Sequence, residues 1–269
     1  MTDLDLPPIR EVVLTRPAGS NAGLREALMA ARRVGLPEPT LITQPLLSIR
    51  ALRDGGELPA ALRAMDSGDL VVFVSPRAVE FADVVRPLVD WPARELAAVG
   101  AATGRALAHA GRPATFLPDS SEDSEGLLEC LREVPMSGRR VWIIRGETGR
   151  ELLADAMAAR GAEPHFVAVY RRECPDPKPP VPTGPACLWI ITAPQALDCF
   201  ARLAGETDGS ESGLLDSTLL VINERARDRA RGLGVRGPIH LAGGPGAEIL
   251  ARAAWQVTAD RQSSSSPRR

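Results

Sequence analysis

Short runs of β-branched and other apolar residues alternate along this chain with longer stretches whose apolar residues recur at helical spacing, as Leu24, Leu28 and Ala31 do. Alternating strands and helices are typical of parallel sheets covered by helices. Ten strands are too many for one compact sheet with these loops, so the pattern predicts two α/β domains. The predicted strands are Glu11–Thr15, Thr40–Ile49, Leu70–Val74, Glu95–Val99, Ala114–Leu117, Arg140–Ile144, Phe166–Tyr170, Cys187–Thr192, Thr218–Ile222 and Ile239–Ala242.

The predicted units follow the same order in the two halves of the chain, which indicates an internal repeat. An Arg follows an apolar run at corresponding places, Arg16 and Arg145. A Pro opens the next helix at Pro76 and at Pro194, a position that suits the first residue of a helix. We interpret the two halves as homologous.

Two segments are predicted to be linkers, residues 43–46 and 171–185. The second contains six prolines, which favour a stiff, extended backbone. Two crossings between two domains imply that one domain is inserted into the other. Residues 259–269 end in a low-complexity Ser/Arg sequence and are predicted to be a disordered tail, either solvated or in contact with an acidic partner.

The residue types that are scarce in this 269-residue chain limit the kinds of catalytic and binding site it can contain. The only Lys, Lys178, does not follow a Gly, which excludes a Walker A phosphate loop. The three His and four Cys show no zinc-ligand spacing and no disulfide framework, which fits a reducing compartment. A net charge of −2 argues against extensive nucleic-acid binding.

Neither end of the chain predicts a targeting segment. Residues 1–8 are acidic and lack the apolar core of a signal peptide, and no run of about 18 apolar residues would span a membrane. We therefore expect a cytoplasmic protein with no membrane partner and no nucleic-acid partner.

Small and polar residues stand at the carboxyl ends of the predicted strands, where parallel α/β sheets bind their ligands. Helix N-termini at these ends present free N–H groups and favour anions. Two facing sets of such ends predict a cleft for a large polyanionic ligand. The residues at these ends include Thr15, Arg16, Ser75, Arg77, Gly100, Ala101, Thr103, Arg145, Gly146, Thr192, Ala193 and 243–245.

Each of these residues also has a purely structural interpretation. Ser75, Thr103 and Thr192 could cap helices, and the arginines could pair with surface carboxylates. Glycines can serve tight turns, and the sequence 100–104 matches a dinucleotide-binding loop only weakly, so nicotinamide binding is not expected. Tyr170, the only Tyr, ends a predicted strand, where it could pack at a domain junction or donate a proton to a substrate.

Taken in order, these motifs resemble the uroporphyrinogen-III synthase family from about Val12 to Trp255. One departure is Thr192-Ala193, where the family often has Thr-Ser, so that a hydroxyl contact is lost or replaced by the backbone. The motifs that carry the resemblance are Leu14-Thr-Arg-Pro17, Val74-Ser-Pro-Arg-Ala-Val79, Ala98-Val-Gly-Ala-Ala-Thr103 with Gly111, Ile144-Arg-Gly-Glu147 with Arg160-Gly161, Val169-Tyr-Arg-Arg172 and Ile191-Thr192.

The resemblance implies two flavodoxin-like parallel-sheet α/β domains joined by a two-stranded linker. One domain would contain residues 1–42 and 175–258, and the inserted domain residues 45–172. Each domain would then contain the Arg-bearing unit of the other half of the sequence.

The resemblance also implies a reaction. Hydroxymethylbilane, a linear tetrapyrrole with eight carboxylates, would lose its terminal hydroxyl as water to give an azafulvene. Ring D would attack through its substituted carbon, and the resulting spiro intermediate would break and reclose with ring D inverted, giving uroporphyrinogen III. The enzyme must chiefly hold the chain ends close and oriented, because cyclisation without inversion competes.

We expect Tyr170 to donate the proton or orient the leaving hydroxyl, with no metal and no cofactor. The resemblance further implies a monomer that receives its substrate from hydroxymethylbilane synthase. Two other functions remain open from the residues: a non-catalytic two-domain small-molecule binding or sensing protein, and a nucleotide-dependent α/β enzyme, which the absent phosphate motifs disfavour. The expected substrate-binding residues are Thr15, Arg16, Ser75, Arg77, Gly100, Ala101, Thr103, Arg145, Gly146, Thr192 and Ala193.

Overall fold

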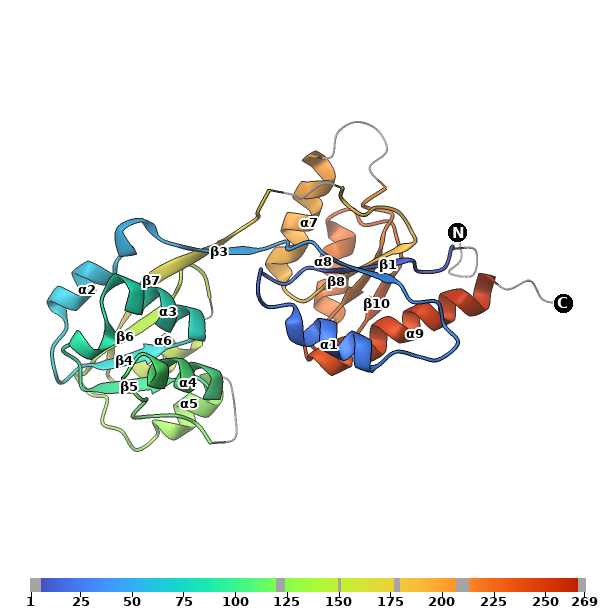
Figure 1. The fold of residues 1–269 in the computed structure, drawn as a ribbon. Coiled ribbons are helices and arrows are strands. Elements are labelled where there is room, and N and C mark those ends of the chain that lie inside the picture. Colours follow the sequence, from blue (N-terminus) through green and yellow to red (C-terminus); the bar gives the residue numbers. More distant parts are fainter. Residues whose placement is uncertain (1–5, 120–123, 150, 177–179, 207–212, 266–269) are drawn as a thin grey trace. The chain divides into compact units, whose positions relative to one another are not determined.

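The computed structural model describes residues 6–119, 124–149, 151–176, 180–206 and 213–265 (Figure 1). The chain divides into two compact units, Met1–Ser48 with Glu173–Arg269 (unit 1) and Ile49–Arg172 (unit 2).

Unit 1 is a five-stranded parallel sheet in the order β10-β9-β8-β1-β2. Numbered along the unit, this is the flavodoxin-like order 2-1-3-4-5. Helices α1 and α9 share the core on one face with Leu24 and Leu250, and α7 and α8 share the core on the other with Phe200 and Ala230. The elements are β1 (Glu11–Leu14), α1 (Ala22–Ala30), β2 (Thr40–Thr43), β8 (Cys187–Ile191), α7 (Pro194–Glu206), β9 (Thr218–Val221), α8 (Glu224–Gly232), β10 (Ile239–Leu241) and α9 (Ala247–Ser265).

Unit 2 contains the sheet β3-β7-β6-β4-β5, whose last four strands are parallel neighbours. Residues of α3 and α4 fill the core on one face and residues of α5 and α6 the core on the other. Together the two units confirm the predicted fold class. The elements are β3 (Ser48–Ala51), α2 (Leu58–Ala64), β4 (Leu70–Phe73), α3 (Pro76–Val85), β5 (Glu95–Ala98), α4 (Ala101–His109), α5 (Ser124–Cys130), β6 (Arg140–Gly146), α6 (Leu152–Ala158) and β7 (Glu163–Glu173), with 3-10 turns at Arg53–Gly55 and Leu88–Asp90.

The predicted repeat reappears in the pairing of the strands. In unit 1, β1 lies beside β8, and in unit 2, β6 lies beside β4. Arg16 follows β1 and Arg145 lies in β6, so each unit contains the Arg-bearing strand of the other half of the sequence. Strands far apart in the chain therefore form the centre of each sheet.

Three predicted elements differ in the structure. The run 40–49 forms two strands in different sheets, β2 and β3, because Gln44-Pro45 interrupts it. The run 114–117 contributes a single bridge, between Ala97 and Phe116. The disorder predicted for 259–269 is wrong for 259–265, which continue α9, since Trp255, Thr258 and Arg261 bury one side of this helix; residues 266–269 lie outside the described residues.

The cysteines depart from the expectation of an all-thiol protein. Cys174, just after β7, forms a disulfide with Cys199 of α7, 25 positions along the chain. Cys130 and Cys187 are free. The Cys187 thiol is buried and donates to Glu11 Oε2 at 2.8 Å; burial, with the nearby carboxylate, raises its pKa to about 12.

In the part of the chain that the structure describes, no helix combines the length and the apolar character needed to cross a membrane.

Candidate functional site

Two helix N-termini meet at one edge of the unit 2 sheet. Strands β4 and β5 are parallel and aligned, with Phe73 opposite Ala98, so α3 and α4 both begin at the carboxyl edge. Ser75 caps α3, its Oγ accepting from the Ala78 N–H at 3.2 Å. Gly100 is the N-cap residue of α4, and Thr103 is buried in its first turn. This edge therefore presents the positive ends of two helices.

Tyr170 lies at the same edge, near the end of β7. Its side chain is 4% exposed, and its Oη lies 3.4 Å from Ser75 Oγ. Its ring also lies 5.7 Å from the ring of Phe81, centroid to centroid, and directly over Gly146, at the end of β6. The structure thus brings three predicted site residues together: Ser75, Gly146 and Tyr170.

The side chains of two predicted arginines of unit 2 have partners other than Ser75 and Tyr170. Arg77 pairs with Glu80, one turn along the surface of α3, at 2.6 Å. Arg145 is buried, and its guanidinium carbon lies 4.5 Å from the ring centroid of Phe166. Phe166 alternates along β7 with Val167, which belongs to the core beside Tyr170, so Arg145 occupies the opposite face of the sheet.

The surroundings of Arg145 are also unsuited to a polyanion. A cavity of about 410 Å³ beside it is lined by the carboxylates of Glu57, Glu147 and Glu151. These negative charges oppose the positive charge of the guanidinium, so a carboxylate ligand would gain little there.

In unit 1, two of the predicted residues are engaged in contacts within the fold. Thr15 is buried, and its hydroxyl donates to the Ile190 carbonyl at 2.6 Å, which joins the end of β1 to β8. Arg16 donates to the Pro245 carbonyl at 2.6 Å, and burial lowers the pKa of its guanidinium. Arg16 therefore links the loop after β1 to the 243–245 turn.

The Thr192-Ala193 departure falls at the start of α7. Ala193 directly precedes Pro194, the first residue of that helix, just as Ser75 precedes Pro76 in unit 2. The side-chain cap that Ser75 provides is therefore absent at Ala193, where the Ala196 N–H bonds to the Ala193 carbonyl at 3.0 Å. Thr192 and Thr103 are not N-cap residues, so the capping interpretation holds for Ser75 alone among the three.

Two residues beside these groups were not among the predicted site residues. Phe81 packs on Tyr170 from α3. Asn21 precedes α1 and is buried; its amide nitrogen donates to the Arg16 carbonyl, and its Oδ1 has no partner. An Asn immediately before a helical apolar pattern is a helix-start signal that could have found Asn21. The sequence does not distinguish Phe81 from an ordinary core aromatic residue, because it does not show that Phe81 packs against Tyr170.

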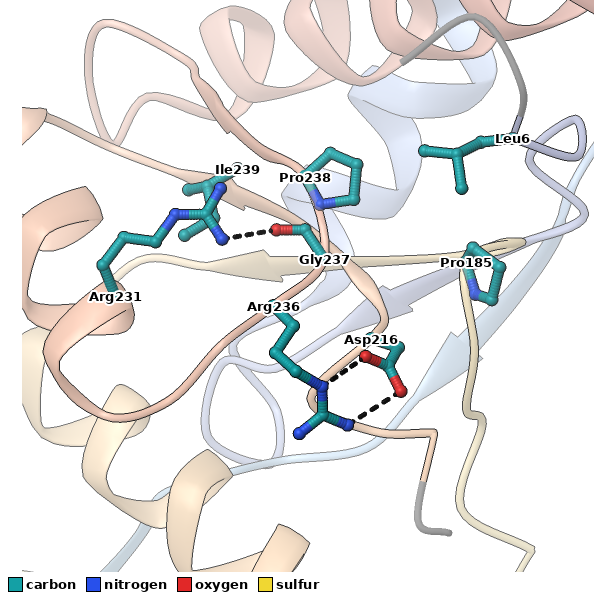
Figure 2. Close-up of a pocket in the computed structure, with 8 residues that line it drawn as sticks. All are labelled: Leu6, Pro185, Asp216, Arg231, Arg236, Gly237, Pro238 and Ile239. Carbon is teal, nitrogen blue, oxygen red and sulfur yellow. Dashed lines mark hydrogen bonds and ion pairs between the residues drawn. The ribbon is translucent and has the colours of Figure 1, made fainter. Parts of the chain in front are cut away.

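A further cavity lies at the amino edge of the unit 1 sheet (Figure 2). It has a volume of about 600 Å³ and adjoins the starts of β9 and β10. Its charged groups are engaged: Arg236 binds Asp216 through two hydrogen bonds, which lower the pKa of that carboxyl, and Arg231 donates to the Gly237 carbonyl. The amino edge of a parallel sheet is not where such folds bind ligands.

Within the described residues, no group of three or more His, Cys, Asp or Glu side chains could hold a metal ion.

Comparison with known proteins gives one family. A model of uroporphyrinogen-III synthase HemD matches residues 39–239. The chain is 30% identical to the uroporphyrinogen-III synthase of Salmonella typhimurium over 231 residues, covering 83% of this chain and 91% of the relative. It is 29% identical to the Escherichia coli synthase over the same shares.

Solved structures share the fold. The uroporphyrinogen-III synthetase of Helicobacter pylori aligns with a TM-score of 0.57 at 17% identity, covering 93% of this chain and 100% of that one. A mutant uroporphyrinogen III synthase of Thermus thermophilus aligns with a TM-score of 0.51 at 18% identity, covering 93% and 99%.

Proposed function

The chain belongs to the uroporphyrinogen-III synthase family, lyases of tetrapyrrole biosynthesis, and we propose that it cyclises hydroxymethylbilane to uroporphyrinogen III with loss of water, using Tyr170 as the proton donor. The observation that supports this role is the pairing of the Tyr170 and Ser75 hydroxyls at 3.4 Å beside the N-terminus of α3. The alternative, a non-catalytic binding protein, is not favoured, because the relatives named above are synthases.

Loss of the terminal hydroxyl needs one proton. The phenol of Tyr170 donates it to the leaving oxygen, and the C–O bond breaks with its electron pair on that oxygen. The pyrrole nitrogen supplies the electrons that form the azafulvene, which keeps its N–H proton and carries the positive charge. The phenol oxygen then carries negative charge where the Ser75 hydroxyl can donate to it and where the N–H groups of α3 begin. The proton released when ring D regains its pyrrole form returns to the phenol oxygen.

The carboxylates of the substrate can be bound by the positive N-terminal ends of helices and by free backbone N–H groups. Their binding does not require catalytic side chains. We propose that Gly100, Ala101 and Thr103 at the start of α4 bind one carboxylate, since the first turn of a helix offers N–H groups without a partner. Thr15, Arg16, Thr192 and Ala193 stay as proposed substrate contacts of unit 1. Arg77 and Arg145 are the weakest of the proposed contacts, because carboxylates of the protein already lie beside both guanidinium groups.

Freshly prepared hydroxymethylbilane tests the activity. The purified protein should give isomer III faster than isomer I forms without enzyme, with the two isomers separated by chromatography. Isomer I alone, at the spontaneous rate, would overturn the proposed activity. Tyr170→Phe tests the residue: we expect a 10²- to 10⁴-fold loss in kcat, the usual contribution of a general acid, and an unchanged kcat would remove Tyr170 from the chemistry.

We also propose that the protein works as a monomer in the cytoplasm and takes its substrate from hydroxymethylbilane synthase. Rapid transfer would help because free hydroxymethylbilane cyclises without inversion. Light scattering of the purified protein at micromolar concentration should give the mass of one chain, and a dimer mass would overturn the monomer proposal. In a coupled assay, direct transfer predicts that the isomer III fraction stays constant on dilution of both enzymes, whereas release into solution predicts a fall.

A further inference from the structure

Gly146 sits where a side chain would collide with Tyr170. It is the last residue of β6, and it pairs with Tyr170 of β7 at a point where the register shifts. A Cβ built on Gly146 would lie 2.6 Å from Tyr170 Cε2, 2.9 Å from Cζ and 3.2 Å from Cδ2. All three nearest atoms belong to one ring, so a side chain at position 146 would first collide with the ring of Tyr170.

The backbone of Gly146 does not itself require glycine. Its φ lies outside the left-handed region in which ten other glycines of the described residues are found. Alanine is therefore allowed by the main chain, and the three atoms nearest to its Cβ would all belong to the ring of Tyr170. The contact is specific to this pair rather than a general need for a flexible residue.

The other sides of the Tyr170 ring are also occupied. Phe81 of α3 lies 5.7 Å away, centroid to centroid, with the two planes inclined at 32°. The phenol oxygen ends 3.4 Å from Ser75 Oγ. Because Ser75 Oγ already accepts from the Ala78 N–H, its own proton is free to point at the phenol oxygen. The position of the ring thus decides whether the two hydroxyls meet.

We propose that Gly146 is a positioning residue: its bare Cα lets the Tyr170 ring lie against β6 and so places the phenol oxygen at Ser75 and the start of α3. The inference rests on the proposed proton-donor role of Tyr170. A methyl group at position 146 would move the ring by about 1 Å to reach ordinary contact distance, and a displacement of that size at a catalytic group can cost about 10²-fold in rate.

The test compares Gly146→Ala in two backgrounds, the natural chain and Tyr170→Phe. The phenylalanine ring meets the same methyl group but has no hydroxyl to misplace. We expect Gly146→Ala to lower the melting temperature similarly in both backgrounds. We expect it to lower kcat for isomer III about 10²-fold, with a much smaller change in KM, only where Tyr170 is present.

Gly68→Ala is the matched control in the same unit. A Cβ on Gly68 would meet only Asp66 Oδ1, at an ordinary 3.4 Å, so its kcat and melting temperature should stay at the natural values. If Gly146→Ala gives no folding transition, Phe81→Leu replaces it, because it removes the second ring that packs against Tyr170. Its kcat loss should likewise appear only where Tyr170 is present.

Two results would overturn the inference. An equal fractional loss of kcat in both backgrounds would make Gly146 a structural residue only, and an unchanged kcat in Gly146→Ala would mean that the ring needs no such space. The proposed function fails separately: an unchanged kcat in Tyr170→Phe removes the proton donor, and absence of isomer III from the natural protein removes the activity.

Discussion

Ser75 has two roles in the structure, helix cap and hydroxyl partner of Tyr170, and a matched residue separates them. Asn223 caps α8 of unit 1 in the same way, with its Oδ1 accepting from the Ala226 N–H at 2.9 Å. It belongs to no proposed site. Ser75→Ala and Asn223→Ala should therefore cause similar losses of stability but different losses of activity.

The magnitudes follow from the contacts that are removed. Loss of a side-chain N-cap costs about 1 kcal/mol, which in units of this size lowers the melting temperature by about 3–5 °C. Ser75→Ala also removes the hydroxyl 3.4 Å from the phenol oxygen of Tyr170. One neutral hydrogen bond contributes about 0.5–1.5 kcal/mol, so kcat should fall roughly two- to thirteenfold.

The assay measures kcat for isomer III and thermal melting on the same preparations. A third variant, Ser75→Asn, retains a good capping side chain but lacks the hydroxyl. It should restore most of the melting temperature and little of kcat. The reasoning is refuted if Ser75→Asn recovers kcat along with stability, or if Asn223→Ala loses as much kcat as Ser75→Ala, since capping alone would then explain Ser75.

Four further predictions concern stability and thiol chemistry. The Cys174–Cys199 cross-link closes a loop of 25 positions, so breaking it, by Cys174→Ser or by a reductant, should destabilise unit 1 by about 3 kcal/mol. Equal melting curves of the natural protein with and without reductant would contradict this. Iodoacetamide at pH 8 should modify exposed Cys130 and spare Cys187 until the protein unfolds, and mass spectrometry of the native protein would reveal the opposite order. The pKa of Cys187 is raised in the folded protein, so the thiol loses its proton at a lower pH in the unfolded chain. The free energy of unfolding should therefore fall as pH rises from about 9 towards 12. In urea titrations at several pH values, Cys187→Ala should reduce this dependence of stability on pH. Arg112 donates to four backbone carbonyls before β5, and Arg112→Met should lower the melting temperature of unit 2, whereas an unchanged value would show that solvent satisfies those carbonyls equally well.

The hydrophobic pattern predicted the strands well because burial on both faces of a parallel sheet leaves a nearly continuous apolar run. Strands β4, β5 and β8 each match their predicted runs to within a residue. The pattern predicts one strand over 40–49 although Gln44-Pro45 interrupts it. It does not show that β2 and β3 join different sheets, because that depends on their strand partners. Likewise, α9 continues past residue 259 because Thr258 and Arg261 are buried by tertiary packing, which local composition does not record.

The candidate site was predictable in position but not in side-chain direction. The repeat placed Arg16 and Arg145 at equivalent strand ends, yet Arg16 reaches the Pro245 carbonyl and Arg145 lies over Phe166. The directions of these two side chains depend on residues that lie near them in the fold but not in the sequence. The Cys174–Cys199 pair depends in the same way on the path taken after β7, because spacing alone does not determine a disulfide partner.

The exchange of strands between the halves of the sequence has a consequence for biosynthesis. Unit 2 is continuous and can complete its sheet as soon as residue 172 leaves the ribosome. Strand β1 lies between β2 and β8, and β8 begins only at Cys187, so β1 and β2 must wait as an isolated pair while the whole of unit 2 is made. At ordinary translation rates that wait lasts roughly ten to thirty seconds. The N-terminal segment is therefore the part of the nascent chain in greatest need of a chaperone.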